Sequence, residues 1–336
     1  MKLGLSLGYA PPGTNPADLF PLVEEAERLG FDSVWVAEAW GTDAVSVLGW
    51  LAGRTERIKL GSAIMQIPGR TPANTAMTAA TLDLLSGGRF LLGLGTSGPQ
   101  VVEGWHGRPW GKPLGRTREY VEIVRGALRR EVVAHEGEHY RIPYDGPGAT
   151  GLGKPLKLML RPLRAEIPIY LAALGPKNVA LAAEIADGWL PIFVAPERFD
   201  EAFGLSLAAA PPDFEIAATA SVLVGDDLPA LRDALRPHVA LYVGGMGSKE
   251  RNFYNALVRR YGWEQEAERI QELYLDGKQR EAIAAVPDEL VDAVSLVGPK
   301  ERIAGRLEAW RETPITTLVL GTSQPEALRT LAELVL

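Results

Sequence analysis

The 336-residue sequence predicts an α/β protein folded as a (β/α)8 TIM barrel with insertions after the fourth and seventh strands. Short apolar runs alternate with stretches of helical periodicity along the chain, which is the pattern of a sheet covered by helices. Eight of these runs are apolar throughout, as is typical of parallel strands buried on both faces. Two intervals between runs are too long for a bare strand and helix, and they locate the insertions.

Local signals justify the first half of the barrel. Strands are expected over residues 3–8, 33–39, 58–65 and 90–95. The first helix begins at Asn15 and Pro16, an N-cap followed by a proline at the first helical position, and ends at Gly30. The second helix is expected over residues 44–53. The third begins at Thr71 and Pro72 and ends near residue 86.

The second half carries the insertions. Strands are expected at residues 168–173, 189–194, 216–224 and 316–321, and a last helix begins near residue 325. The first insertion, residues 96–167, contains a helix over 116–130 and a stretch rich in glycine and proline over 135–164. The second, residues 226–315, reads as several helices. Both insertions follow carboxyl ends of strands, so we expect them to wall the site of one domain that spans residues 1–336.

Composition excludes several classes of function. The chain has no cysteine, which removes disulfides, thiolate metal sites, iron–sulfur clusters and cysteine nucleophiles. A formal charge of −7 gives no electrostatic reason to expect a nucleic-acid partner. The four histidines lack metal-ligand spacing, so no metal is expected. No signal peptide and no apolar window of ~18 residues is found, which predicts a cytoplasmic protein with no membrane partner.

One glycine-rich segment imitates a nucleotide-binding motif. Residues 93–98, Gly-Leu-Gly-Thr-Ser-Gly, match the dinucleotide fingerprint, which opens directly into a helix. The glycines and prolines after Pro99 are expected to prevent a regular helix from following immediately. We therefore favour a strand end that lets a flat or phosphorylated ligand approach the backbone, with a simple tight turn as the alternative.

The helix after the fifth strand has an unusual start. Gly175 is its expected N-cap and Pro176 its first residue, and Lys177 follows in the first turn. A lysine there opposes the helix dipole, unless an anion shares the site with the free N–H groups. The segment therefore predicts a phosphate site, with a solvated lysine as the alternative.

Two side chains are candidates for proton transfer. Glu38 follows the second strand in an otherwise apolar segment, where a carboxylate can act as acid, base or polar cofactor contact. A paired structural carboxylate is the alternative. His106 is the only histidine whose segment is expected to reach the barrel mouth.

Several segments resemble the bacterial luciferase-like superfamily. They are Val36-Ala-Glu-Ala-Trp40, residues 61–72 (Gly-Ser-Ala-Ile-Met-Gln-Ile-Pro-Gly-Arg-Thr-Pro), residues 88–97 (Gly-Arg-Phe-Leu-Leu-Gly-Leu-Gly-Thr-Ser) and residues 175–189. Residues 97–107 and 116–120 are similar to the oxidoreductases of this superfamily that use coenzyme F420, a 5-deazaflavin. The resemblance covers nearly the whole chain.

The resemblance implies where a cofactor binds. Its ring would lie in the barrel mouth against a bulge of the third strand that holds a non-prolyl cis peptide, by position Ala63–Ile64, and its phosphate at the start of the helix at Gly175. The residues expected to contact the cofactor are Ser6, Gly8, Glu38, Ala63, Ile64, Met65, Gly95, Ser97, Leu174, Gly175, Pro176 and Lys177.

The resemblance also implies an activity, hydride transfer between coenzyme F420 and a small organic substrate by a homodimeric enzyme. Ala39 stands where sugar-phosphate dehydrogenases of this family carry a histidine base, so their mechanism is not expected here. Glu38 or His106 remain candidates for the proton. The alternatives are an FMN-dependent monooxygenase that works with a partner reductase, and a non-catalytic flavin-binding protein.

Overall fold

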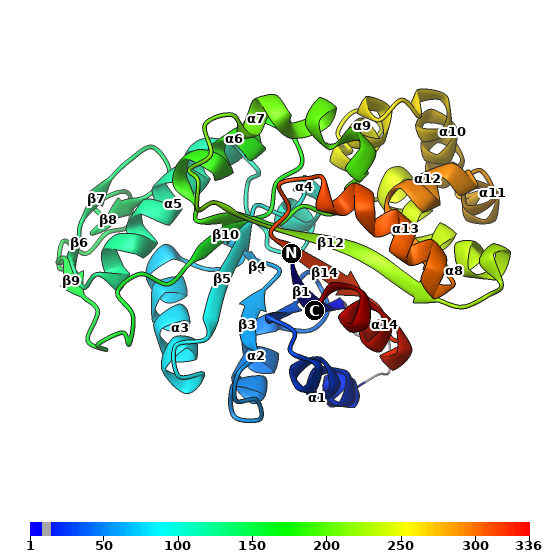
Figure 1. The fold of residues 1–336 in the computed structure, drawn as a ribbon. Helices are drawn as coiled ribbons and strands as arrows, with labels where there is room; N and C mark the ends of the chain where they lie inside the picture. Colours follow the sequence, from blue (N-terminus) through cyan, green and yellow to red (C-terminus); the bar gives the residue numbers. More distant parts are fainter. Residues whose placement is uncertain (9–14) are drawn as a thin grey trace.

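Eight parallel strands close into a barrel in the computed structural model, which describes residues 1–8 and 15–336 (Figure 1). Around the ring they are β1 (Lys2–Gly8), β2 (Ser33–Val36), β3 (Lys59–Ser62), β5 (Phe90–Gly95), β10 (Ile169–Leu171), β11 (Gly188–Trp189), β12 (Glu215–Val224) and β14 (Thr317–Gly321). Parallel pairing of β14 with β1 closes the ring. The predicted barrel is confirmed.

Helices cover the outside of the barrel. They include α1 (Phe20–Leu29), α2 (Ala44–Ala52), α3 (Pro72–Leu85), α5 (Pro113–Leu128), α6 (Pro176–Ile185), α7 (Leu205–Leu207), α8 (Leu228–Ala240) and α14 (Pro325–Val335). Asn15 caps a short 3-10 turn, Pro16–Leu19, that leads into α1, and Gly30 ends α1 with φ 90°. The Thr71 side chain accepts the Asn74 N–H at 3.2 Å at the start of α3. These predicted boundaries are confirmed.

In Figure 1, the short strands of the first insertion lie at the left, and the helices of residues 253–284 in the second insertion lie at the right. The first holds α4 (Pro99–Gly104), α5, and the short strands β6 (Val132–Val133), β7 (His135–Glu136), β8 (Arg141–Ile142) and β9 (Leu156–Lys157). The second holds α8, α9 (Phe253–Arg260), α10 (Glu264–Leu275), α11 (Gln279–Ala284), α12 (Asp288–Ala293), β13 (Ser295–Gly298) and α13 (Lys300–Arg311).

Two local expectations were wrong. A helix does follow the glycine-rich segment, because α4 is only six residues long and ends at Gly104, the first of the glycines that were expected to prevent it. The second insertion holds several helices, as expected, and in addition the strand β13, which pairs with the end of β12. The sixth strand is shorter than expected because the chain leaves the sheet after Trp189, and Phe193 takes a left-handed φ of 57°. Beyond Trp189, an isolated bridge from Ile192 to Thr219 continues the pairing with β12.

Large side chains fill the barrel interior where glycines make room. The rings of Trp35 and Tyr170 pack edge to face, 5.2 Å apart. A Cβ on Gly61 would lie 2.2 Å from the Trp35 ring, and one on Gly93 would lie 1.8 Å from the Ser62 carbonyl oxygen. The glycines of these strands therefore serve packing inside the barrel.

Charged residues close the amino-terminal end of the barrel. Lys2 Nζ lies 2.5 Å from a carboxylate oxygen of Glu215, and the buried Tyr170 hydroxyl donates to the other oxygen. Burial alone would raise the pKa of Glu215, but the hydrogen bonds from Lys2 and Tyr170 outweigh it and lower that pKa. This end is packed and paired, whereas the large cavity of the described residues lies at the carboxyl ends of the strands.

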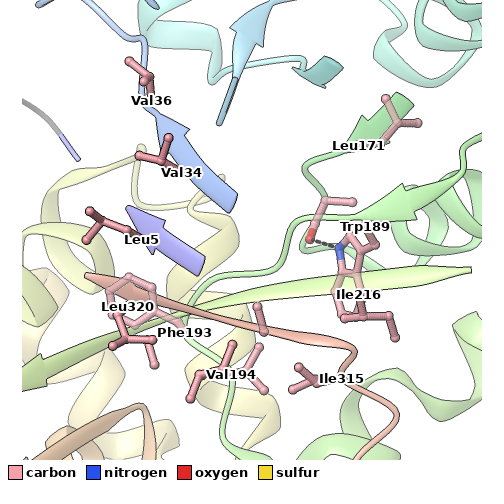
Figure 2. Packing of buried hydrophobic residues seen from close by; sticks show 14 of the residues in the cluster. Leu5, Val34, Val36, Leu171, Trp189, Phe193, Val194, Ile216, Ile315 and Leu320 are labelled. Carbon is pink, nitrogen blue, oxygen red and sulfur yellow. Dashed lines mark hydrogen bonds between the residues drawn. The ribbon is translucent and has the colours of Figure 1, made fainter. Parts of the chain in front are cut away.

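The main core lies between strands and helices. Figure 2 shows Leu5, Val34 and Leu320 among these side chains, together with the hydrogen bond that the Trp189 indole N–H donates. Its acceptor is the Ala173 carbonyl oxygen at 2.9 Å, which fixes the chain just beyond β10. Among the described helices, none is long and apolar enough to cross a membrane.

Candidate functional site

A cavity of about 690 Å³ opens at the carboxyl ends of the barrel strands. Nine residues expected to contact a cofactor line it: Ser6, Gly8, Glu38, Ala63, Ile64, Gly95, Ser97, Leu174 and Gly175. They come from segments far apart in the sequence, and the closed barrel brings them together. A cavity of this size and place suits an organic ligand of cofactor dimensions.

Four expected site residues are not among those that line the cavity. Met65 is buried in the core outside the barrel, because alternation along the strand turns its side chain away. Pro176 and Lys177 are exposed at the start of α6. His106 packs against Gly69, with Nε2 3.2 Å from Gln66 Oε1.

His238, in the second insertion, is the histidine that lines the cavity. The expectation that only His106 reaches the mouth was therefore wrong. The sequence could not decide this point, because the position of the second insertion depends on tertiary contacts.

The third strand forms the floor of the cavity. The peptide bond between Ala63 and Ile64 is cis, as the family resemblance implied. After this bond the chain continues as β4 (Met65–Gln66), which pairs with β5. The Ile64 side chain lies across Gly95, where a Cβ would be 2.9 Å from it. Gly95 thus leaves space for Ile64, and Ala63 and Ile64 present an apolar surface to the cavity.

The start of α6 borders the same cavity. Gly175 is the N-cap, as expected, with no side-chain hydrogen bond to cap the helix, and a Cβ there would meet nothing within 4 Å. Asn178 and Val179 both donate to the Gly175 carbonyl oxygen. Helix geometry leaves the Lys177 N–H without an intrahelical acceptor, so the helix presents a positive dipole end and a donor here.

Arg260 supports this helix start from the second insertion. Its Nη2 donates to the Leu174 carbonyl oxygen at 2.8 Å, and its guanidinium lies 5.8 Å from the centre of the Phe203 ring. Burial lowers the pKa of Arg260. Sequence reasoning missed this residue, because no local pattern links α9 to the loop before α6.

Glu38 is a paired carboxylate. Arg70 donates to both of its oxygens, and the Ala44 N–H donates to Oε2 at 3.1 Å. The side chain is only 9% exposed. Glu38 therefore joins the start of α2 to the segment that carries Arg70. This is the structural alternative considered for the residue, and it leaves little of the carboxylate free for proton transfer.

Four rings gather at the part of the cavity formed by the second insertion. We call Phe193, His238, Tyr242 and Tyr254 the aromatic wall, and all four line the cavity. Phe193 follows β11, while the others come from α8, the π-helical turn Leu241–Gly245 and α9. The spacing of His238 and Tyr242, four residues apart in a helical segment, is the one signal that the sequence offered.

Electrostatically, the cavity is nearly neutral. Within the described part of the chain, the lining residues include no Lys, Arg or Asp, and the one Glu, Glu38, is paired with Arg70. The arrangement can hold a flat apolar ring on the floor, an anionic group at the start of α6 and a small second molecule at the aromatic wall.

Comparisons with known proteins agree with this geometry. The chain is 49% identical, over its whole length and 99% of the relative, to a Mycobacterium tuberculosis protein provisionally named a coenzyme F420-dependent oxidoreductase. It is 31% identical to the 5,10-methylenetetrahydromethanopterin reductase of Archaeoglobus fulgidus, over 96% of this chain and 93% of that one.

Among solved structures, the coenzyme F420-dependent tetrahydromethanopterin reductase from Methanopyrus kandleri shares the fold. It has a TM-score of 0.78 and 24% identity, and the match covers 99% of this chain and 97% of that one. The family model for luciferase-like monooxygenases matches residues 1–317. The chain belongs to the luciferase-like monooxygenase family.

Proposed function

We propose that the protein is an oxidoreductase that binds coenzyme F420 in the barrel-mouth cavity and transfers a hydride between it and a small organic substrate. The observation that carries the proposal is the combination, in one cavity, of an apolar floor and the uncapped start of α6. A flat ring with an anionic tail needs both features. The relatives named for this cofactor support the choice of coenzyme F420.

The described residues fit such a cofactor. Ala63 and Ile64 would support the ring, Gly95 and Ser97 would border it, and Gly175 with the N–H of Lys177 would hold the phosphate. When bound, the deazaflavin supplies a two-electron hydride carrier, which the protein alone lacks.

The protein's own residues hold the walls of the cavity in place and exclude water from it. Arg260 holds the Leu174 carbonyl oxygen and so orients the helix start. The Arg70–Glu38 pair keeps the second strand's end and α2 in place at the rim. The second insertion covers the cavity with aromatic and aliphatic side chains, which lowers the local dielectric and favours hydride transfer over exchange with solvent.

A titration tests the cofactor. Tryptophan fluorescence of the purified protein is followed while coenzyme F420 or FMN is added. We expect quenching by coenzyme F420 with an affinity at least about tenfold higher than for FMN. Preferential FMN binding would support the FMN-dependent monooxygenase instead. Binding of coenzyme F420 without reoxidation of its reduced form by any tested acceptor would support the non-catalytic binder.

We also propose that the protein is a cytoplasmic homodimer. The exposed apolar side chains Met77, Leu84 and Leu85 on α3 support a dimer interface. Light scattering during gel filtration tests it, with a dimer mass expected and a monomer mass contradicting it. Fractionation of cells tests the location.

A further inference from the structure

The aromatic wall is built as a unit. The rings of Phe193 and His238 are stacked, with an interplanar angle of 8° and centroids 5.4 Å apart. Tyr242 lies 4.6 Å from His238 and 4.7 Å from Tyr254, measured between ring centroids. Each ring therefore touches at least one other, and together they form a continuous surface for another ring to pack on.

Hydrogen bonds behind the wall fix its shape. The Tyr261 hydroxyl donates to the Phe193 carbonyl oxygen at 3.1 Å, which holds the left-handed backbone of Phe193. The side-chain amide of the buried Asn252 donates to the Tyr242 carbonyl oxygen at 2.9 Å. The wall is thus preorganised, which reduces the entropy that binding would cost.

The described surroundings of the aromatic wall include no cation. Leu235, Val239 and Met246 extend it, and none of the described residues that line the cavity is a Lys or an Arg. A carboxylate or phosphate at the wall would lose its hydration without gaining a cation, which is unfavourable.

The imidazole of His238 adds two ring nitrogens to this surface, beside the hydroxyls of Tyr242 and Tyr254. His238 is exposed to the cavity, and desolvation by the protein atoms around it lowers its pKa from the ordinary value of 6.5, which favours the neutral imidazole at pH 7. A neutral imidazole offers one N–H donor and one nitrogen acceptor. It can therefore hydrogen-bond to an uncharged oxygen, as donor to a carbonyl or as acceptor from a hydroxyl.

We propose that the aromatic wall is the substrate subsite and that it selects an uncharged ring compound bearing a carbonyl or hydroxyl group, whose oxygen hydrogen-bonds to His238. The proposal rests on the proposed function, because it assigns the partner of the bound cofactor. Sugar phosphates and organic acids are excluded as substrates by the same argument. His238 acts here as a specificity-determining residue that contacts the substrate.

Calorimetric titration tests the subsite without turnover. The probes are acetophenone and benzoate, which share a ring but differ in charge, added to protein loaded with oxidised coenzyme F420 and to cofactor-free protein. We expect benzoate to bind at least about tenfold more weakly than acetophenone. Equal affinity would overturn the proposal. Failure of coenzyme F420 to bind would contradict the proposed function. In that case, the titration of cofactor-free protein would still compare the affinities of the aromatic wall for acetophenone and benzoate.

Variants separate a contact from a structural role. His238→Phe keeps a ring but removes the polar atoms. It should weaken the binding of acetophenone about tenfold, as expected for the loss of one hydrogen bond. His238→Gln keeps a donor and an acceptor and should restore affinity to within about threefold. The affinity for coenzyme F420 should not change in either variant. Unchanged acetophenone affinity in His238→Phe, or no recovery in His238→Gln, would overturn the assignment.

A second variant keeps the test independent of His238. Tyr254→Leu removes a ring but retains apolar bulk. It should therefore weaken the binding of acetophenone more than the binding of 2-butanone, which has no ring. Tyr144→Phe, on the exposed part of the first insertion, is the control and should change neither affinity. Equal weakening of both ketones in Tyr254→Leu would contradict recognition of a ring.

Discussion

At the scale of single residues, the site depends on which polar groups are already paired. The position of Glu38 in the sequence correctly placed it at the barrel mouth. Whether its carboxylate is free or paired, however, depends on Arg70, which lies 32 positions away in the sequence. His238 shows the reverse case, since its helical spacing from Tyr242 is the one local signal, and that spacing alone does not mark a ligand contact. Pairing and exposure of a polar group are properties of the folded surroundings, so the sequence left both open.

Replacing Glu38 tests its pairing. Glu38→Gln should lower the free energy of unfolding by about 2–3 kcal/mol, because it leaves the largely buried Arg70 without part of its counter-charge. Urea denaturation measures the change. Glu201→Gln, which removes an exposed partner of Arg198, is the control and should cost less than about 0.5 kcal/mol. An unchanged stability of Glu38→Gln would mean that the carboxylate is free for chemistry.

Glu215 gives a prediction for pH. Its pKa is lowered in the folded protein from the ordinary value of 4.5, so its contribution is present above pH 4.5 and is lost as the pH falls toward the lowered value. Glu215 is partly exposed, so Glu215→Gln should cost only about 1 kcal/mol at pH 7. The difference from the original protein should shrink as the pH falls below 4.5. Thermal melts across this range measure it, and a difference independent of pH would contradict the pairing.

At the scale of elements, the glycines of β5 have two different roles. Gly93 in β5 gives room to the backbone of β3, whereas Gly95, two residues later, leaves space for a side chain of the cavity floor. The dinucleotide-like spacing of these glycines thus has a packing cause in the barrel. Sequence reasoning found the strand and the ligand-facing end, but could not separate the two purposes, because they depend on the neighbouring strand.

Substitution of these glycines distinguishes packing from function. Gly93→Ala places a Cβ 1.8 Å from the Ser62 carbonyl oxygen, so it should destabilise the fold by more than about 3 kcal/mol or prevent folding. Gly104→Ala, where a Cβ meets nothing within 4 Å, is the control and should be within about 1 kcal/mol of the original. Expression level and chemical denaturation report both. A stable Gly93→Ala protein would refute the packing explanation.

The start of α6 gives a prediction for cofactor binding. Lys177→Glu replaces a cation beside the first-turn N–H groups by an anion. The variant should therefore bind coenzyme F420 about tenfold more weakly, because the new carboxylate repels the phosphate. The dissociation constant from fluorescence quenching measures this. Lys154→Glu makes the same change in charge on an exposed stretch of the first insertion and should have no effect. Equal affinities of the two variants for coenzyme F420 would contradict the assignment of the phosphate site to the start of α6.

At the scale of the whole molecule, the alternation of strands and helices was sufficient to predict the barrel and both insertions. What the sequence could not place was the arrangement within the insertions. The four-residue strand β13 has the same apolar pattern as a helix segment, and the six-residue helix α4 is shorter than a periodic pattern can reveal. That residues 1–336 form one domain remains a prediction.

The central claim is that a flat, phosphorylated redox cofactor binds at the carboxyl ends of the strands. A crystal structure of the protein with coenzyme F420 tests it most directly. We expect density for the ring against Ala63 and Ile64, and for the phosphate at the N–H groups beginning at Gly175. Density for the ring outside this cavity, or for the phosphate away from the start of α6, would contradict the account.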